Sequence, residues 1–217
     1  MVSFQGSPWR PDLPHPRRPL LVGCLCLCLL ALTTLSLCAQ RGALVIQQNL
    51  AELVQEADTI VRGSVLSAQV EPHPELRNLH TVVVTLRVER VLKDQAEGTF
   101  TFRQYIWDVR DRYNAAGYRK GQRLLLLLIK PSQYGLSSPA GMDQGRFRLA
   151  PDQEGRLTAV NGAANHGLFR GVTPLLEEQG IRLPRRLTQT VAADAGGPLP
   201  LEDLEALISA LARAKED

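Results

Sequence analysis

Within residues 81–92, apolar residues occupy every second position from 82 to 88, where they are Val82, Val84, Leu86 and Val88. A period of two predicts a β-strand with one buried face and one wetter face. Shorter patterns of the same kind predict further strands over residues 59–70, 99–107, 145–149 and 156–160. The run Leu124–Ile129 is wholly apolar and too short to cross a membrane, so it predicts a central strand buried on both faces.

Two segments repeat their apolar residues with helical spacing instead. Residues 44–57 predict a short amphipathic helix, and residues 201–215 predict a longer one with acidic residues at its start and basic residues at its end. Residues 173–200 carry four prolines and the pair Gly196–Gly197. They predict a linker, or an arm that lies on the domain.

Together these elements predict a mainly-β, α+β fold. The short strands with intervening turns favour a small antiparallel barrel of five or six strands over residues 44–172, flanked by an N-terminal and a C-terminal amphipathic helix. A sandwich of two sheets is the alternative.

The first 39 residues have the pattern of a secretory signal. A polar segment with three arginines precedes the apolar run Leu20–Leu37, and Ala39 is a small residue suited to the position before a cleavage site. An uncleaved membrane anchor is the competing interpretation, because 18 apolar residues can just span a bilayer. Lipidation of Cys38 is a third. All three predict that the folded part is exported, whether periplasmic, secreted or anchored facing outward.

The composition of that exported part limits the kinds of functional site it could contain. All four cysteines (Cys24, Cys26, Cys28 and Cys38) fall within or next to the apolar run, so a chain that starts after Ala39 has no disulfide, thiol nucleophile or thiolate metal site. The whole chain has 25 Lys and Arg against 22 Asp and Glu. This balance gives no support for nucleic-acid binding, which normally needs a strong basic excess.

Four motifs between residues 50 and 150 resemble a known domain. They are ADTIVRGSV (57–65), VERVLK (88–93), GQRLLLLL (121–128) and QGRFRL (144–149). Their order is similar to that of a recurrent, uncharacterised domain of exported bacterial proteins, and to the netrin-type module of the tissue inhibitors of metalloproteinases. The resemblance implies an OB-type barrel and an exported location. Those inhibitors act through an N-terminal cysteine and disulfides, which the chain after residue 39 lacks, so their mechanism does not carry over.

The densest polar and aromatic cluster runs from Trp107 to Tyr113. Its aromatic residues and Arg110 are the types that dominate binding surfaces, so Trp107, Arg110 and Tyr113 are the candidate binding residues. Asp108 and Asp111 could instead form an acid and base pair of the kind that glycosidases use. With His166, which lies in an Asn-His-Gly turn, they are the candidates for catalysis.

Other candidate sites are weaker. His73 and His80 flank the loop 71–80 and would need Glu71 or Glu75 to complete a metal site, so they are interpreted as surface histidines and no metal or other cofactor is expected. Arg182, Arg185 and Arg186 cluster near Pro184. They could bind an anionic headgroup or a carboxylate, although an exposed, solvated arm is the favoured interpretation.

The sequence therefore predicts an exported, non-catalytic module that binds a protein, peptide or glycan. It predicts contact with a membrane only through an uncleaved N-terminal segment. A secreted hydrolase that uses the carboxylates of residues 108–111, and a membrane-tethered structural protein of the envelope, are the alternatives.

Overall fold

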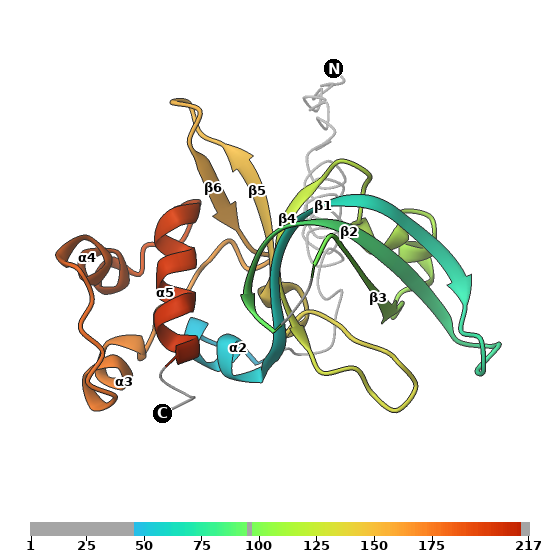
Figure 1. The fold of residues 1–217 in the computed structure, drawn as a ribbon, viewed down its shortest axis with the longest axis horizontal. Coiled ribbons are helices and arrows are strands. Elements are labelled where there is room, and N and C mark those ends of the chain that lie inside the picture. Colours follow the sequence, from blue (N-terminus) through green and yellow to red (C-terminus); the bar gives the residue numbers. More distant parts are fainter. Residues whose placement is uncertain (1–45, 95–96, 214–217) are drawn as a thin grey trace, which may run out of the picture. The chain divides into compact units, whose positions relative to one another are not determined.

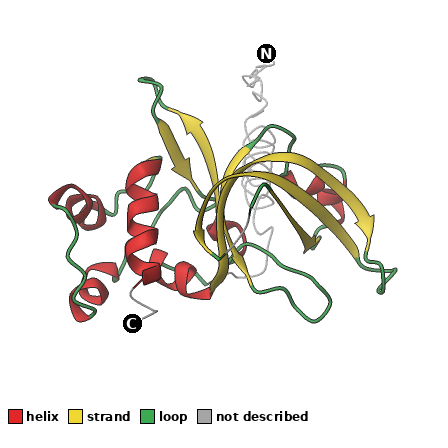
Figure 2. Cartoon of the chain, in the orientation of Figure 1, coloured by secondary structure: helices red, strands yellow, loops and turns green. Residues whose placement is uncertain are grey.

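One antiparallel sheet of seven strands organises the protein (Figures 1 and 2). The computed structural model describes residues 46–94 and 97–213. The strands follow the order β3-β2-β1-β4-β5-β6-β7. Their bounds are β1 Ala57–Pro72, β2 His80–Lys93, β3 Thr99–Tyr105, β4 Arg123–Ile129, β5 Arg146–Pro151, β6 Leu157–Val160 and β7 Leu199–Pro200. The predicted mainly-β, α+β class is confirmed.

The predicted barrel of five or six strands is wrong, because the sheet is open. Strands β5, β6 and β7 continue outward from β4, and helices cover this part instead of a closing strand. Residues 136–140 nevertheless link β4 to β3. Ala140 donates its N–H to the Leu127 carbonyl at 2.8 Å, and Ser137 donates to the Arg103 carbonyl at 2.8 Å. Single bridges join Leu128 to Pro139 in antiparallel and Arg103 to Leu136 in parallel orientation.

Strand β1 bends because its register is interrupted. Its first half pairs with both β2 and β4, and its second half pairs with β2. Shifts in the register with β2 occur at Ile60/Val61, Arg62/Gly63 and Val65/Ser67. Such bulges bend a strand and increase its twist. A side chain at Gly63 would collide with the Arg87 carbonyl oxygen of β2, so the close approach of the two backbones requires glycine.

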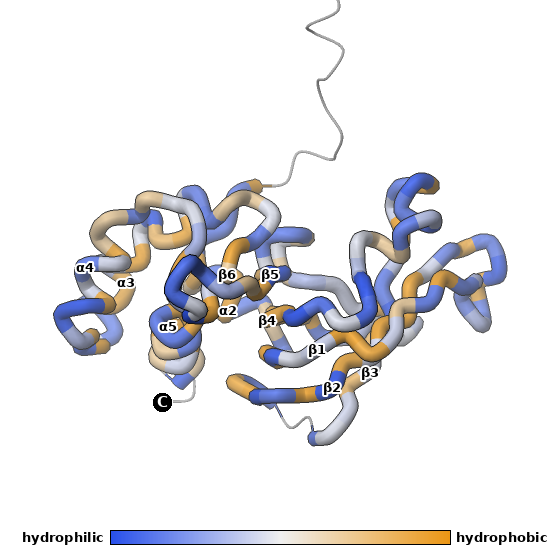
Figure 3. The backbone as a smooth tube through the Cα atoms, turned by 90° about the horizontal axis from the view of Figure 1, so that it is seen from above, coloured by the Kyte–Doolittle hydropathy of each residue, from blue (hydrophilic) through white to orange (hydrophobic). Residues whose placement is uncertain are grey.

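The sheet buries both of its faces in its centre. Leu125 and Leu127 of β4 point into a core made with the helices, whereas Leu124, Leu126 and Leu128 point into a second core between the curled strands β1–β4. This confirms that Leu124–Ile129 is a strand buried on both faces. Val82, Val84 and Leu86 fill the second core and are fully buried, as their period of two predicts. Hydrophobic and hydrophilic residues alternate along β1 and β2 in Figure 3.

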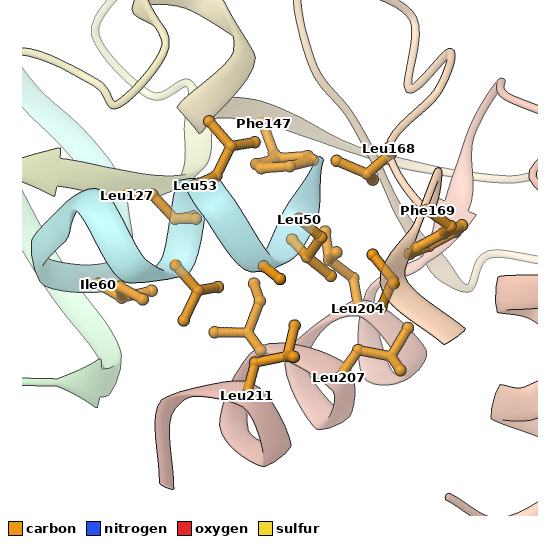
Figure 4. Packing of buried hydrophobic residues seen from close by; sticks show 14 of the residues in the cluster. Leu50, Leu53, Ile60, Leu127, Phe147, Leu168, Phe169, Leu204, Leu207 and Leu211 are labelled. Carbon is orange, nitrogen blue, oxygen red and sulfur yellow. The ribbon is translucent and has the colours of Figure 1, made fainter. Parts of the chain in front are cut away.

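Helices α2 (Leu50–Glu56) and α5 (Leu201–Arg213) pack against each other in the first core (Figure 4). Both were predicted, but α2 begins six residues later than its apolar pattern suggests. Asn49 is the reason: its side chain accepts the Glu52 N–H at 3.0 Å, while the Glu52 carboxylate accepts the Asn49 N–H at 2.7 Å. This reciprocal capping fixes the start of the helix.

Residues 173–200, predicted as a linker or as an arm that lies on the domain, hold helices α3 (Val172–Glu178) and α4 (Arg185–Ala193) followed by β7. Leu176, Leu187 and Val191 of these helices are buried in the first core. The prolines do not break the helices. Pro174 lies in the first turn of α3 and Pro184 immediately precedes α4, and these positions need no backbone N–H donor.

A buried carboxylate joins α5 to the sheet. The side chain of Glu205 is 3 % exposed and accepts hydrogen bonds from Arg62 of β1 at 2.8 Å and Arg90 of β2 at 2.7 Å. Arg62 also lies 3.4 Å from Glu89, which pairs with Arg123 at 2.7 Å. These contacts with Arg123 lower the pKa of Glu89.

The N-terminal segment with its apolar run and all four cysteines lies outside the described residues. Within residues 46–94 and 97–213, no helix has the length and apolar character that crossing a bilayer requires.

Candidate binding surface

The three candidate binding residues lie on the connection between β3 and β4, in a segment that we call the aromatic loop (residues 106–118). Trp107 is 73 % exposed and Tyr113 is 91 % exposed, and Val109 between them is also exposed. The Trp107 ring stands edge-on to Tyr105, with 4.9 Å between the ring centroids. Large apolar side chains that are exposed together on one loop are a feature of interaction sites.

Buried residues hold both ends of the aromatic loop. At its start, Ile106 is buried and donates its N–H to the His80 carbonyl at 3.0 Å. At its end, the buried Tyr118 ring meets Phe102 edge-on, and its hydroxyl donates to Gln104 at 2.8 Å. The loop is therefore fixed to the second core at both ends.

Side chains also fix the interior of the aromatic loop. Asp108 accepts the Arg110 N–H at 2.9 Å and caps the 3-10 turn Val109–Arg112. Its carboxylate binds the Arg110 guanidinium through contacts of 2.6 to 3.0 Å, and this hydrogen bonding raises the pKa of Arg110. Asn114 caps the next turn, Ala115–Gly117. Arg110 is thereby held in one orientation.

Arg146, which lies on β5 and not in the aromatic loop, also supports the loop. Its guanidinium donates to the Ala116 carbonyl at 2.8 Å, lies 4.8 Å from the centre of the Tyr118 ring, and pairs with Asp143 at 3.0 Å. Ala115 and Ala116 have positive φ angles of 50° and 53°, a conformation that alanine rarely adopts. These contacts hold that conformation in place.

Burial raises the pKa of Tyr118 to about 12, although the nearby Arg146 opposes the shift. Because the unfolded tyrosine ionises near pH 10, the unfolded state loses its proton first. We expect the free energy of unfolding to fall by about 3 kcal/mol as the pH rises from about 10 to about 12. Denaturant titrations across this range measure the fall. Tyr118→Phe should remove this part of the pH dependence, and an unchanged slope would contradict the assignment.

Of the catalytic candidates, Asp108 and Asp111 belong to the same 3-10 turn, whereas His166 lies on a different connection, between β6 and α3. Both Asp108 oxygens bind Arg110, and Asp111 is half-buried in the 3-10 turn. The His166 carbonyl accepts a hydrogen bond from Gln47, and the His166 ring packs against Gly196. Buried Asn161 and Asn165 hold this turn by bonding to each other and to Gln144, Ala159 and Gly197. In the aromatic loop, the Asp108 carboxylate is already bound to Arg110. The loop can therefore present a fixed surface.

The interpretation of His73 as a surface residue is wrong. His73 is buried, its Nε2 lies 2.8 Å from the Tyr134 carbonyl, and its Nδ1 accepts the N–H groups of Glu75 and Leu76. It joins the loop 71–80 to the loop 131–144. Glu71 pairs instead with Arg103 at 2.6 Å. In the described part of the chain, no group of three His, Cys, Asp or Glu side chains could hold a metal ion.

The three arginines near Pro184 are exposed. Arg186 contacts Glu202 at 2.8 Å and Asp203 at 3.1 Å on α5. The partners of this arginine, and the pairing of Arg62 and Arg90 with Glu205, could not be predicted from the sequence. Residues 62 and 205 are far apart in the sequence, and no local pattern relates them.

Comparison with protein families, curated proteins and solved structures finds no match to the chain.

Proposed function

We propose that this chain is an exported, non-catalytic binding module whose aromatic loop binds a protein, peptide or glycan. The observation that carries the proposal is the exposure of Trp107 and Tyr113 on a loop that is rigidly held. Exposing two such rings to water is unfavourable unless a partner covers them. Because the loop is already ordered, binding costs little conformational entropy.

Arg110 completes the proposed contact surface. Asp108 orients its guanidinium but leaves it exposed. Tryptophan, tyrosine and arginine are the residue types that most often dominate the binding energy of an interface. The loop combines all three within seven residues.

Export and family membership form the second part of the proposal. The leader pattern of residues 1–39 supports export, with cleavage, anchoring and lipidation as its three forms. The order of the four motifs at residues 57–65, 88–93, 121–128 and 144–149 supports the resemblance to the exported netrin-like domain, although the sheet is open and not closed as that resemblance implies.

The test is the double substitution Trp107→Ala and Tyr113→Ala in the full chain. We expect capture of partners from an extract of exported proteins, or binding to a glycan array, to fall by roughly a hundredfold or more, because each hot-spot residue contributes about 2 kcal/mol or more. The thermal midpoint should change little, since both side chains are exposed.

The matched control is Tyr134→Ala, which removes an exposed aromatic ring from another loop. The Tyr134→Ala variant should capture as much partner as the wild type does. A chain with Trp9→Phe adds a direct readout, because Trp107 is then the only tryptophan, and bound partner should protect its fluorescence from iodide. Equal capture by the double variant, or unprotected fluorescence in the complex, would disprove the proposal.

A further inference from the structure

We propose that His73 is a pH-sensitive latch, which holds the segment 131–140 against β3 at neutral pH and releases it in acid. We call this segment the closing loop, because it links β4 to β3. Its Ala140 N–H bonds to β4 and its Ser137 N–H bonds to β3, each at 2.8 Å. The inference goes beyond the proposed function, because neither His73 nor the closing loop belongs to the aromatic loop.

The contacts of the His73 ring fix its protonation state. Its Nε2 lies 2.8 Å from the Tyr134 carbonyl oxygen, which can only accept a hydrogen bond, so Nε2 carries the proton. Its Nδ1 accepts the backbone N–H groups of Glu75 at 3.2 Å and Leu76 at 3.1 Å. Because these two groups can only donate, Nδ1 must keep its lone pair. The geometry therefore fits the neutral imidazole alone.

Protonation of Nδ1 would break this arrangement. The new N–H would face two N–H donors that have lost their acceptor. The His73 side chain is 2 % exposed, so water cannot replace the lost bonds while the ring stays in place. A histidine that is buried in its neutral form opposes folding once it must carry a charge. Acid therefore favours the state in which the ring has left its site.

The charged groups around the ring do not offset that cost. The titratable and charged residues of the two loops and of the strand ends beside them are Glu71, Glu75, Arg77, His80, Arg103, Lys130 and Tyr134. Glu71 is paired with Arg103 at 2.6 Å, and the Glu75 side chain is exposed. Tyr134 presents an edge-on ring with 6.4 Å between the centroids. Within residues 46–94 and 97–213, no carboxylate pairs with the His73 ring.

Release of the latch would open one side of the second core. A groove of about 380 Å³ runs beside the closing loop. Its lining includes Phe100 and Phe102 of β3, Leu128 of β4, and Pro131, Gly135 and Ser137 of the closing loop. Phe102 and Leu128 are buried members of the second core. Movement of the closing loop away from β3 would therefore uncover apolar surface.

The test is amide hydrogen exchange of the full chain at pH 7.5 and at pH 5, corrected for the intrinsic pH dependence of exchange. The closed state is favoured above about pH 6.5, where a free histidine is neutral, and loses its advantage as the pH falls below that value. We expect protection of the Ser137 N–H to fall by roughly tenfold or more at pH 5. Protection of residues 124–126 should stay the same, because these residues pair with β1 and β5.

His73→Gln is the decisive variant, because its amide can still donate to the Tyr134 carbonyl but does not titrate. Protection of its Ser137 N–H should be the same at both pH values. His80→Gln is the matched control, since it removes the histidine at the other end of the loop 71–80 and should respond to acid as the wild type does. An acid response of His73→Gln equal to that of the wild type, or full protection of the wild type at pH 5, would overturn the latch.

NMR titration of the wild-type imidazole replaces the variant if His73→Gln leaves the closing loop open at both pH values. The ring should show the Nε2–H tautomer at pH 7.5. It should take up a proton with the same midpoint at which the Ser137 N–H loses protection, and separate midpoints would contradict the latch. None of these results affects the aromatic loop, whose test measures capture of a partner.

Discussion

Replacing Glu205 with glutamine is expected to lower the free energy of unfolding by about 3 to 5 kcal/mol. The side chain is almost fully buried and balances the charges of Arg62 and Arg90. Glutamine keeps the volume but removes the negative charge. Arg62 is largely buried, and its Nε makes no hydrogen bond within the described residues, so its charge would lose its main compensation. Denaturant unfolding measures the loss, with the same dependence of the free energy on denaturant concentration used for both proteins.

The control for Glu205→Gln lies on the same helix. Glu202 also binds an arginine, at 2.8 Å, but its side chain is 73 % exposed. The same substitution there should cost at most about 1 kcal/mol, because water screens the pair. Similar losses for the two variants would mean that burial does not set the strength of the Glu205 cluster.

Replacing Gly63 with alanine is expected to lower the free energy of unfolding by about 3 kcal/mol. The new Cβ would overlap the Arg87 carbonyl oxygen, which is backbone and cannot move aside as a flexible side chain could. The backbone of Gly63 itself has no positive φ, so the cost comes from lack of space. Relief requires β1 and β2 to separate, and this would also displace the adjacent Arg62 from Glu205.

Ser67→Ala tests whether this cost is specific to the bulge at Gly63. Ser67 lies on the same strand and is half-buried, and alanine fits wherever serine does. We expect a change within about 0.5 kcal/mol. A loss at Gly63 no larger than this would show that the two strands can separate freely at that point.

Strand positions could be predicted from the sequence because each strand in this protein carries its own local pattern. The alternation of residues 82–88 and the apolar run 124–129 indicate most of the buried side chains, although Val88 is only half-buried. Strand ends were less exact: β3 stops at Tyr105, where the chain turns inward at Ile106. The open sheet could not be predicted, because closure depends on whether a neighbouring strand or a helix covers β4, β5 and β6.

The features that were not predicted from the sequence depend on contacts between distant residues, or on prolines whose effect on the helices was misinterpreted. Helices α3 and α4 are short, and the position of each proline relative to the first turn decides whether it breaks or begins a helix. His73 lies in a loop rich in proline and polar residues, so its burial depends on the loop around Tyr134 that covers it. The aromatic loop was located by composition, but its supports at Tyr118 and Arg146 depend on the tertiary structure.

The packing of α2 against α5 has a consequence for how the protein is made. Leu204, Leu207 and Leu211 of α5 complete the core that α2 begins (Figure 4). Because α5 follows all seven strands along the chain, this core can be completed only after the whole sheet has been synthesised.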